Sequence, residues 1–359
     1  MNDTLQDMMR EATRLTRAGH LTEATELIQR ALNGSKTPTA SPQPFTPTPC
    51  SVIDGIVLNR SVDVDQPNAV MDAAGDFISG SHTHAGLTRN YKLYVPPLYA
   101  GRALPLVVML HGCTQDADDF AAGTEMNERA REQGFFVLYP TQSQDGNTQR
   151  CWNWFARAHH HRGSGEPALL ADMTQSVITR YGIDAHRVYI AGLSAGGAMA
   201  DIVASAYPEI YAAVGIHSGL PRGAATNVAG AFAVMKNGEP AAHSTAKVSA
   251  ATVPSIVFHG DADHTVHPKN GEQVIAALLR SIESSEPSVE QGTASGGRNY
   301  TRSLYRANNG EPLAEHWLVK GAGHAWSGGS ANGSYTDAKG PNATGEMLRF
   351  FFEHPRSDG

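Results

Sequence analysis

From about residue 90 onward, the chain alternates short, continuously apolar runs with longer segments of helical periodicity. Six of these runs have the composition of buried strands, and they span Leu104–Leu110, Gly134–Pro140, Arg187–Gly192, Ala212–Ser218, Val253–Gly260 and Glu315–Gly321. Helix-period segments such as Asp116–Gln133 and Ala168–Tyr181 lie between the first four runs. A strand is apolar along its whole length where helices cover both faces of its sheet. The sequence therefore predicts an α/β fold with a mainly parallel sheet, in which the alternating segment Arg89–Pro97 forms an antiparallel edge strand.

The size, composition and charge of the chain restrict the class of protein. Its 359 residues are 41% hydrophobic and 18% charged, which suits one large globular domain or one domain with an appendage. The formal net charge is −7 and lysine and arginine form no block, so neither nucleic acid nor an anionic membrane is expected as a partner. No stretch reaches about 18 apolar residues, and the N-terminus resembles no leader sequence. We therefore expect a cytoplasmic protein with no membrane span.

Polar residues follow four of the predicted strands at their carboxyl ends. The sequence LHGCTQ follows the strand that ends at Leu110, and Ser194 follows the strand that ends at Gly192. HGDADHTVH and GAGHAW follow two later strands. Because the carboxyl ends of parallel strands meet at one edge of the sheet, these groups are expected to converge. Their order along the chain, Ser then Asp then His, is that of the α/β-hydrolase fold.

The segment YIAGLSAGGAMA places Ser194 among small residues, between a predicted strand and a predicted helix at Ala198–Tyr207. Gly192 and Gly196 lie two residues to either side of the serine. A sharp strand-to-helix turn forces its central residue into strained backbone angles, and a Cβ on those neighbours would clash. The spacing predicts that Ser194 is a nucleophile held on such a turn. His324, at the last polar strand end, is predicted to be its general base.

Several longer strings are more specific than the GxSxG pattern. FAAGTEMNERA, CWNWF, RGSGEPALL, AGLSAGGAMA, YAAVGIHSGL, HGDADHTV and GAGHAWSGG together resemble the PHB depolymerase family of esterases, which is related to feruloyl and acetyl xylan esterases. The resemblance extends from about Phe77 to Phe352. It implies an α/β-hydrolase that cleaves carboxylic esters and needs neither a cofactor nor a metal ion.

The resemblance also implies roles for an acid and for two cysteines. The family pattern HGxxD implies that Asp263 orients His324, while Asp261 remains an alternative that would otherwise hold the turn. Relatives bridge the positions of Cys113 and Cys151, which implies a disulfide here. The third cysteine, at position 50, is expected to be free. A disulfide conflicts with the expected cytoplasmic location, because disulfides persist mainly in oxidising compartments.

Backbone amides and aromatic side chains complete the expected site. An oxyanion hole is expected from the amide of Ala195 and from that of Cys113, or of its neighbour Thr114, in the loop after the first central strand. Trp154 and Trp326 are expected to form the wall of an acyl pocket, because strand-end loops are poor places to bury indole rings.

Three other groups of polar residues have less specific interpretations. Glu166 is expected to be structural, either anchoring its loop or capping the helix that follows, and His159–His161 are expected to lie in a solvated loop. One segment contains ligand types for zinc or calcium, namely His259, Asp261, Asp263, His264 and His267. A turn that already supplies the orienting acid accounts for this segment, so no metal site is predicted.

The first 50 residues differ in character from the rest. In residues 1–34, apolar residues recur at helical spacing on both sides of Ala18–His20, which predicts a helical hairpin that docks, dimerises or contacts a granule surface. Residues 35–50 are rich in proline and threonine and are expected to form a linker. Residues 51–359 are then the predicted catalytic domain.

The sequence therefore predicts a serine esterase that acts through an acyl-enzyme, and we expect short-chain hydroxyalkanoate (3-hydroxybutyrate) oligomers or polymers as its substrates. Feruloyl or acetyl xylan esterase activity is the alternative within the same class of enzyme. A different class remains open, in which the N-terminal hairpin makes the chain chiefly a granule-binding or partner-binding protein with incidental hydrolysis.

Overall fold

The computed structural model describes residues 74–97, 99–238, 253–280 and 286–357. The predicted hairpin (1–34), the predicted linker (35–50) with its cysteine and the predicted start of the catalytic domain at residue 51 lie outside these ranges. In the part of the chain that is described, no helix is long and apolar enough to cross a membrane.

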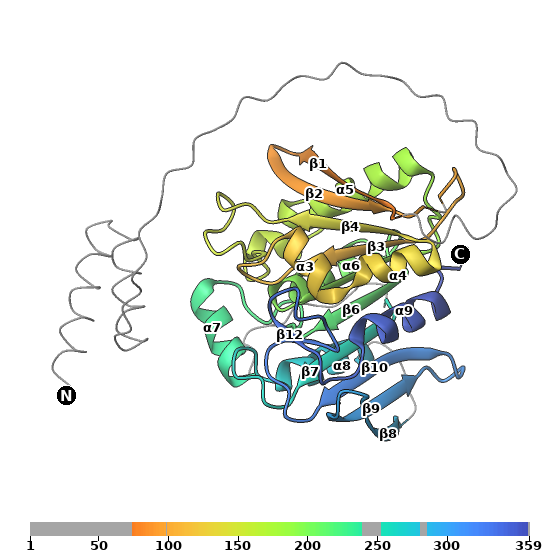
Figure 1. Ribbon diagram of the computed structural model, residues 1–359. Coiled ribbons are helices and arrows are strands. Elements are labelled where there is room, and N and C mark those ends of the chain that lie inside the picture. The colour runs from red at the N-terminus through yellow and green to blue at the C-terminus, as the bar shows by residue number, and fades with distance from the viewer. Residues whose placement is uncertain (1–73, 98, 239–252, 281–285, 358–359) are drawn as a thin grey trace, which may run out of the picture. The chain divides into compact units, whose positions relative to one another are not determined.

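The described residues are organised around one sheet of ten strands (Figure 1), in the order β1-β2-β4-β3-β5-β6-β7-β10-β9-β8. Its strands are β1 (Asp76–His84), β2 (Leu87–Val95), β3 (Leu106–Leu110), β4 (Phe136–Thr141), β5 (Val188–Leu193), β6 (Ala213–His217), β7 (Ser255–Gly260), β8 (Ser288–Thr293), β9 (Asn299–Arg306) and β10 (Pro312–Val319). A separate short ladder joins β11 (Trp326–Ser327) to β12 (Thr336–Asp337).

All six predicted buried strands are confirmed, and they form the parallel centre of the sheet as β4, β3, β5, β6, β7 and β10. Every residue of β3, β5, β6 and β7 is buried. This burial explains their continuous apolar sequences, because helices cover both faces of the sheet.

The edges of the sheet differ from the prediction. The segment predicted to be an edge strand forms β2, which is antiparallel to both of its neighbours, but β1 pairs along its outer side. On the opposite side, β9 and β8 extend the sheet beyond β10. The strands β1, β8 and β9 carry many polar residues and are half-buried or exposed, so continuous apolar runs did not reveal them.

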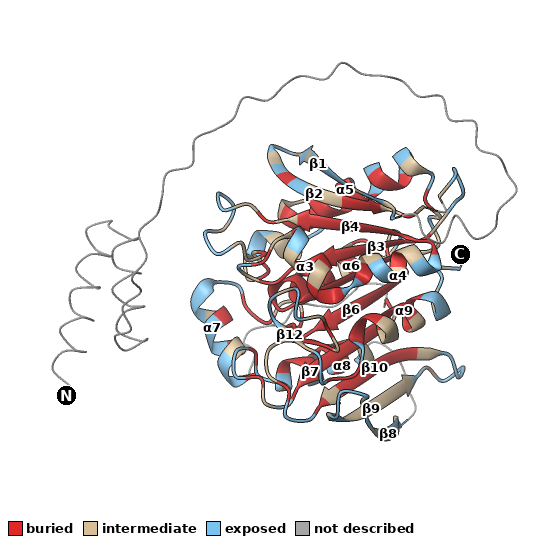
Figure 2. Cartoon of the chain, viewed as in Figure 1, coloured by how far each residue is buried: buried red, intermediate tan, exposed pale blue. Residues whose placement is uncertain are grey.

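Helices pack on both faces of the sheet, as the burial pattern in Figure 2 illustrates. They are α3 (Ala117–Thr124), α4 (Met126–Gln133), α5 (Gly165–Tyr181), α6 (Ala195–Ala206), α7 (Val228–Asn237), α8 (Lys269–Leu279) and α9 (Ala343–Glu353), with a short 3₁₀ helix η1 (Arg157–His160). Alternate residues of a strand point to opposite faces. Leu106, Val108 and Leu110 of β3 therefore share a core with α5, α6 and α8, whereas Val107 and Met109 share a core with α3, α4 and α9.

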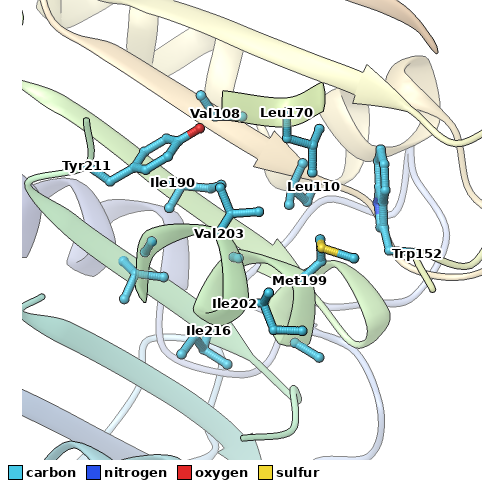
Figure 3. Close-up of a cluster of buried hydrophobic side chains, with 14 of the residues drawn as sticks. Val108, Leu110, Trp152, Leu170, Ile190, Met199, Ile202, Val203, Tyr211 and Ile216 are labelled. Carbon is cyan, nitrogen blue, oxygen red and sulfur yellow. The ribbon is translucent and has the colours of Figure 1, made fainter. Parts of the chain in front are cut away.

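Helix α6 is held on the sheet by an apolar face (Figure 3). Met199, Ile202 and Val203 lie at helical spacing and pack near Ile190 and Ile216 of the underlying strands. Burying a side chain of this size contributes about 1.5–3 kcal/mol relative to leaving it exposed. This packing fixes the N-terminus of α6, and therefore Ser194, relative to the end of β5.

The segment predicted as one helical stretch, Asp116–Gln133, is two helices. Glu125 has a left-handed backbone (φ 53°) and separates α3 from α4. Phe120 and Met126 are both buried in the same core, although six residues of a straight helix would place them about 120° apart around its axis. The break at Glu125 lets both side chains reach that core.

Candidate active site

Ser194 occupies a strained turn between β5 and α6. Its backbone angles are φ 58° and ψ −119°, a region that a residue with a side chain adopts only where the surrounding structure enforces it. A Cβ on Gly192 would lie 2.4 Å from the carbonyl group of Gly196, and a Cβ on Gly196 would lie 2.0 Å from the Leu110 oxygen. The close approach of β3, β5 and α6 therefore requires glycine at both positions.

His217, on the neighbouring strand β6, supports this turn through its backbone and binds the segment after His324 through its ring. Its carbonyl oxygen accepts a hydrogen bond from the Ser194 amide (2.8 Å). Its buried ring accepts a hydrogen bond at Nε2 from the Ser327 amide (2.9 Å) and donates from Nδ1 to the Ser218 hydroxyl (3.1 Å). Burial lowers the pKa of the His217 imidazole to about 3, so the ring is neutral and can accept. No motif in the sequence predicted a role for His217.

His324 and Asp263 lie together at the ends of β10 and β7. His324 Nδ1 donates to Asp263 Oδ2 at 2.7 Å, and the other carboxylate oxygen accepts from the amides of Thr265 (2.9 Å) and Val266 (2.8 Å). The Asp263 side chain is fully buried, whereas that of His324 is 11% exposed. The carboxylate thus fixes the imidazole tautomer and leaves its Nε2 free to accept a proton.

Asp263 stays ionised although it is buried. Burial raises the pKa of its carboxyl group, but hydrogen bonds from His259, His324 and the Val266 amide outweigh that effect and hold the pKa well below its ordinary value. His259 Nε2 lies 3.5 Å from Asp263 Oδ2 and donates to the Val266 carbonyl at 2.8 Å. A carboxylate held in this way can stabilise an imidazolium without taking its proton.

Asp261 lies in the same turn but has a different set of contacts. Its carboxylate accepts from the Gly321 amide (2.6 Å) and lies 3.5 Å from Lys320 Nζ, and its own amide bonds the Val319 carbonyl (3.0 Å). These contacts tie the end of β7 to the turn that precedes His324. Asp261 therefore holds the turn, while Asp263 contacts the histidine.

The loop after β3 faces Ser194 across a shared cavity. Ser194, Ala195, Cys113 and His324 all line this cavity. The Thr114 amide is already bonded to the Gln149 carbonyl (2.7 Å), whereas the amides of Cys113 and Ala195 have no acceptor among the described residues. Of the two expected alternatives in this loop, Cys113 therefore has the amide that is free to bind an oxyanion.

Two connections hold the Cys113 loop in place. The structure joins Cys113 to Cys151 by a disulfide, the pairing that the family resemblance implied. Gln115, which is buried, accepts from the Gly112 amide (2.9 Å) and donates to Asp119 (2.8 Å) and to the Ser334 carbonyl (3.2 Å). Gln115 thus links the Cys113 loop to the segment that follows His324. Gln115 had no predicted role, although it belongs to the LHGCTQ string.

Glu166 is structural, as expected, but it lies in the first turn of α5 and anchors the CWNWF loop rather than its own loop. Its carboxylate accepts from the Asn153 amide (2.8 Å) and from the side chains of Asn153 (2.8 Å) and Gln142 (2.5 Å). The expectation of a solvated loop at His159–His161 is wrong for two of the three histidines. His160 donates to the Trp154 carbonyl (2.7 Å), and His159 Nδ1 lies 3.5 Å from Glu166. Both thereby support the loop that carries Trp154.

The shared cavity has a volume of about 450 Å³ and a mainly apolar wall, in the size range of small-molecule sites. Its apolar side chains include Trp154, Phe155, Leu193, Leu220, Phe232 and Met235. Trp154 therefore lies where it was expected. The polar segment 147–149 lines another part of the cavity.

Trp326 does not line the cavity, contrary to expectation. Its side chain is 1% exposed, and its indole nitrogen donates to the Thr344 hydroxyl (3.0 Å). The ring stacks against His217 (centroids 5.1 Å apart) and meets the edge of Phe120 (5.5 Å). Strand β11 turns this tryptophan into the core shared with α3 and α9, where an indole can be buried because its N–H has a partner.

The histidines and aspartates of residues 259–267, which are the ligand types for zinc or calcium, differ in burial. His259 and Asp263 are buried, whereas Asp261, His264 and His267 are exposed. Throughout the described ranges, no group of three or more His, Cys, Asp or Glu residues is arranged to hold a metal ion.

The described residues form an α/β-hydrolase. Its sheet is mainly parallel, a strained serine follows β5, and a histidine–aspartate pair lies at the ends of β10 and β7. Solved structures agree at the level of the fold. An acetyl xylan esterase from Aspergillus awamori matches with a TM-score of 0.60 at 20% identity, over 77% of this chain and 99% of that one.

The chain belongs to the family described as esterase PHB depolymerase, whose profile matches residues 89–288. Among curated relatives, poly(3-hydroxyalkanoate) depolymerase C of Paucimonas lemoignei is 31% identical over 256 residues, 69% of this chain and 60% of the relative. A probable acetylxylan esterase A of Aspergillus clavatus is 27% identical over 238 residues, 57% of this chain and 74% of the relative. The chain thus spans less than two thirds of the depolymerase.

Proposed function

We propose that this protein is a serine esterase that hydrolyses 3-hydroxyalkanoate esters, most directly short-chain 3-hydroxybutyrate oligomers, through an acyl-enzyme. The observation that carries the proposal is the hydrogen bond between His324 and Asp263 beside a cavity that also contains Ser194. Membership of the PHB depolymerase family and the 31% identical depolymerase support the substrate class.

The proposed reaction begins with attack of the Ser194 hydroxyl oxygen on the ester carbonyl carbon. His324 Nε2 accepts the serine proton, and the Asp263 carboxylate stabilises the resulting imidazolium. The carbonyl oxygen becomes an oxyanion that the free amides of Cys113 and Ala195 bind. Preorganised donors of this kind typically contribute about 2.7–4 kcal/mol each to the transition state.

The tetrahedral intermediate then collapses to an ester of Ser194. Its C–O bond to the leaving alcohol breaks, and His324 returns its proton to that alcohol. A water molecule, deprotonated by the same nitrogen, attacks the acyl carbonyl carbon. The bond between that carbon and the Ser194 oxygen then breaks, and His324 gives its proton to the serine oxygen, which releases the acid and the free serine. His324 thus alternates between general base and general acid while Asp263 orients it, and no step needs a metal ion or a cofactor.

Acetyl xylan esterase activity is the second candidate, with feruloyl esterase activity as a variant of it. It is favoured by the 27% identical acetylxylan esterase and by the polar segment 147–149 on the cavity wall. The apolar remainder of the cavity favours the hydroxyalkanoate substrate instead, because a polysaccharide chain would lose hydrogen bonds to water there.

Substitution of the nucleophile tests the class of enzyme. Ser194→Ala should abolish hydrolysis of p-nitrophenyl butyrate and of 3-hydroxybutyrate trimers, while Ser176→Ala, on the exposed side of α5, should keep full activity. A folded Ser194→Ala protein with wild-type turnover would refute the proposal. A parallel series with methyl ferulate and acetylated xylan distinguishes the substrates, since higher kcat/KM on either would favour the second candidate.

The compartment and the role of the predicted N-terminal hairpin are also part of the proposal. The Cys113–Cys151 disulfide favours an oxidising compartment over the expected cytoplasm. We retain the hypothesis that residues 1–34 contact a granule or a second copy of the chain. Deleting residues 1–48 tests it: lost localisation with unchanged turnover would support it, and unchanged localisation, oligomeric state and turnover would contradict it.

A further inference from the structure

Exposed apolar side chains are concentrated at the mouth of the active-site cavity. Six large hydrophobic side chains are exposed in the described ranges: Ile78, Val228, Phe232, Val289, Tyr335 and Phe352. Val228, Phe232 and Tyr335 also line the cavity that contains Ser194. Phe232 is 67% exposed and Val228 is 54% exposed. Both side chains therefore contact solvent as well as the cavity.

Helix α7 has a continuous apolar face that is exposed to solvent. Ala229 and Ala233 are exposed and lie beside Val228 and Phe232 at helical spacing, while Ala231 and Val234 on the opposite side are buried. We call the four exposed residues, Val228, Ala229, Phe232 and Ala233, the α7 face. The helix lies at one side of the domain and is largely exposed there (Figures 1 and 2).

The α7 face has no charge and no polar side chain. The only charged residue of α7 is Lys236 in its last turn. Exposed apolar groups that adjoin a binding cavity generally mark a binding surface. Because Val228 and Phe232 belong to both the cavity wall and the α7 face, a ligand that leaves the cavity on this side passes directly onto the helix.

The cavity is too small for a polymer chain. A volume of about 450 Å³ is that of a site for a drug-sized molecule. The rest of a longer polyester must lie outside, across the rim. Its ester units are uncharged and have no hydrogen-bond donors, so they match an apolar rim, whereas a hydrated polysaccharide does not.

We propose that the α7 face binds the apolar surface of a solid hydroxyalkanoate polyester and positions a polymer chain at the mouth of the cavity. This inference rests on the proposed function. Contact with the polyester removes the side chains of Val228 and Phe232 from water, and this burial supplies the driving force. A soluble oligomer held within the cavity contacts the face only at Val228 and Phe232, because Ala229 and Ala233 do not line the cavity.

The test introduces a charged pair on the α7 face outside the cavity. Ala229→Glu with Ala233→Lys, made in a Ser194→Ala background, leaves every cavity side chain other than Ser194 intact. A Glu–Lys pair at this spacing supports an exposed helix and adds no net charge. The matched control is Gln175→Glu with Thr179→Lys on α5, where both residues are exposed and have the same spacing. Depletion from solution by a poly(3-hydroxybutyrate) film measures binding, and thermal midpoints verify folding.

We expect the α7 pair to weaken film binding at least about tenfold, which corresponds to about 1.4 kcal/mol, and the α5 pair to leave it unchanged. Equal binding by the α7 pair would overturn the inference, as would wild-type binding to insoluble acetylated xylan in place of the film. A change in oligomeric state caused by the α7 pair would assign the face to a second copy of the chain and also overturn it.

Hydrolysis of soluble trimers keeps this inference distinct from the proposed function. The same pairs made with Ser194 intact should hydrolyse 3-hydroxybutyrate trimers at the wild-type rate, since neither pair lines the cavity. If the wild-type protein hydrolyses trimers and the Ser194→Ala protein with an unaltered α7 face does not bind the film, the inference about α7 alone fails. If the wild-type protein hydrolyses no trimer, the proposed substrate fails, whatever the film shows.

Discussion

Replacing Asp263 with asparagine tests whether this carboxylate sets the position of the proton on His324. Asp263 Oδ1 accepts two backbone amides, from Thr265 (2.9 Å) and Val266 (2.8 Å). An asparagine keeps both bonds only with its carbonyl oxygen at that position. Its amide nitrogen then replaces Oδ2, 2.7 Å from His324 Nδ1 in the native structure. Two donors cannot bond each other, so the imidazole must move its proton to Nε2, which then cannot accept from Ser194.

The expected loss of kcat depends on the two hydrogen bonds from the Thr265 and Val266 amides. Turning the asparagine over would restore an acceptor for His324 but would sacrifice both amide bonds, at about 0.5–1.5 kcal/mol each, and would place its NH₂ group against two amide donors. The unproductive tautomer therefore dominates. The corresponding change in a serine protease lowers kcat about 10⁴-fold, which is about 5.4 kcal/mol in the barrier. KM should change little, because Asp263 does not line the cavity.

Single-turnover acylation with p-nitrophenyl butyrate measures the defect, and thermal midpoints show whether the variant is folded. Asp261→Asn is the matched control, because an asparagine oxygen can still accept from the Gly321 amide. It loses only a surface ion pair with Lys320, which is worth about 1 kcal/mol or less. A large acylation defect in Asp261→Asn together with near-normal Asp263→Asn would refute the reasoning.

The remaining predictions concern pH, the Cys113 loop and the disulfide. His217 and His111 are buried, and burial lowers their pKa values from 6.5 to about 3 and about 4. Unfolding therefore takes up protons below pH 6.5. The free energy of unfolding should fall with decreasing pH, by up to about 1.4 kcal/mol per pH unit for each histidine. Denaturant unfolding of His217→Gln between pH 4 and 6.5 should give a shallower dependence, and an unaltered slope would contradict this account. Gln115→Ala should lower kcat, because it frees the Gly112 amide and the oxyanion loop; an equal loss in the exposed control Gln175→Ala would show that the effect is not specific. Cys113→Ser with Cys151→Ser should cost about 2–4 kcal/mol of unfolding free energy and reduce kcat, whereas a variant as stable and active as wild type would show that the bridge is dispensable.

The layered fold and the candidate serine could be predicted from local sequence. Strands buried on both faces must be continuously apolar, and β3 to β7 and β10 are the six runs that the pattern indicated. The need for glycine on both sides of Ser194 could also be predicted, because the clash that a Cβ would make there is a property of the local turn. Strands β1, β8 and β9 escaped detection since they carry many polar residues and are less buried, so no continuous apolar run marks them.

The contacts between distant segments required the folded structure. Asp261 and Asp263 are two residues apart in one turn, and only the position of β10 beside β7 directs the first to Gly321 and the second to His324. Trp326 follows a strand end, as a cavity residue would, yet the short ladder of β11 and β12 turns it towards Thr344. The link from Gln115 to Ser334 joins residues 219 positions apart. Periodicity and motif spacing predict the local conformation that neighbouring residues in the sequence favour. These contacts depend instead on which strands lie side by side.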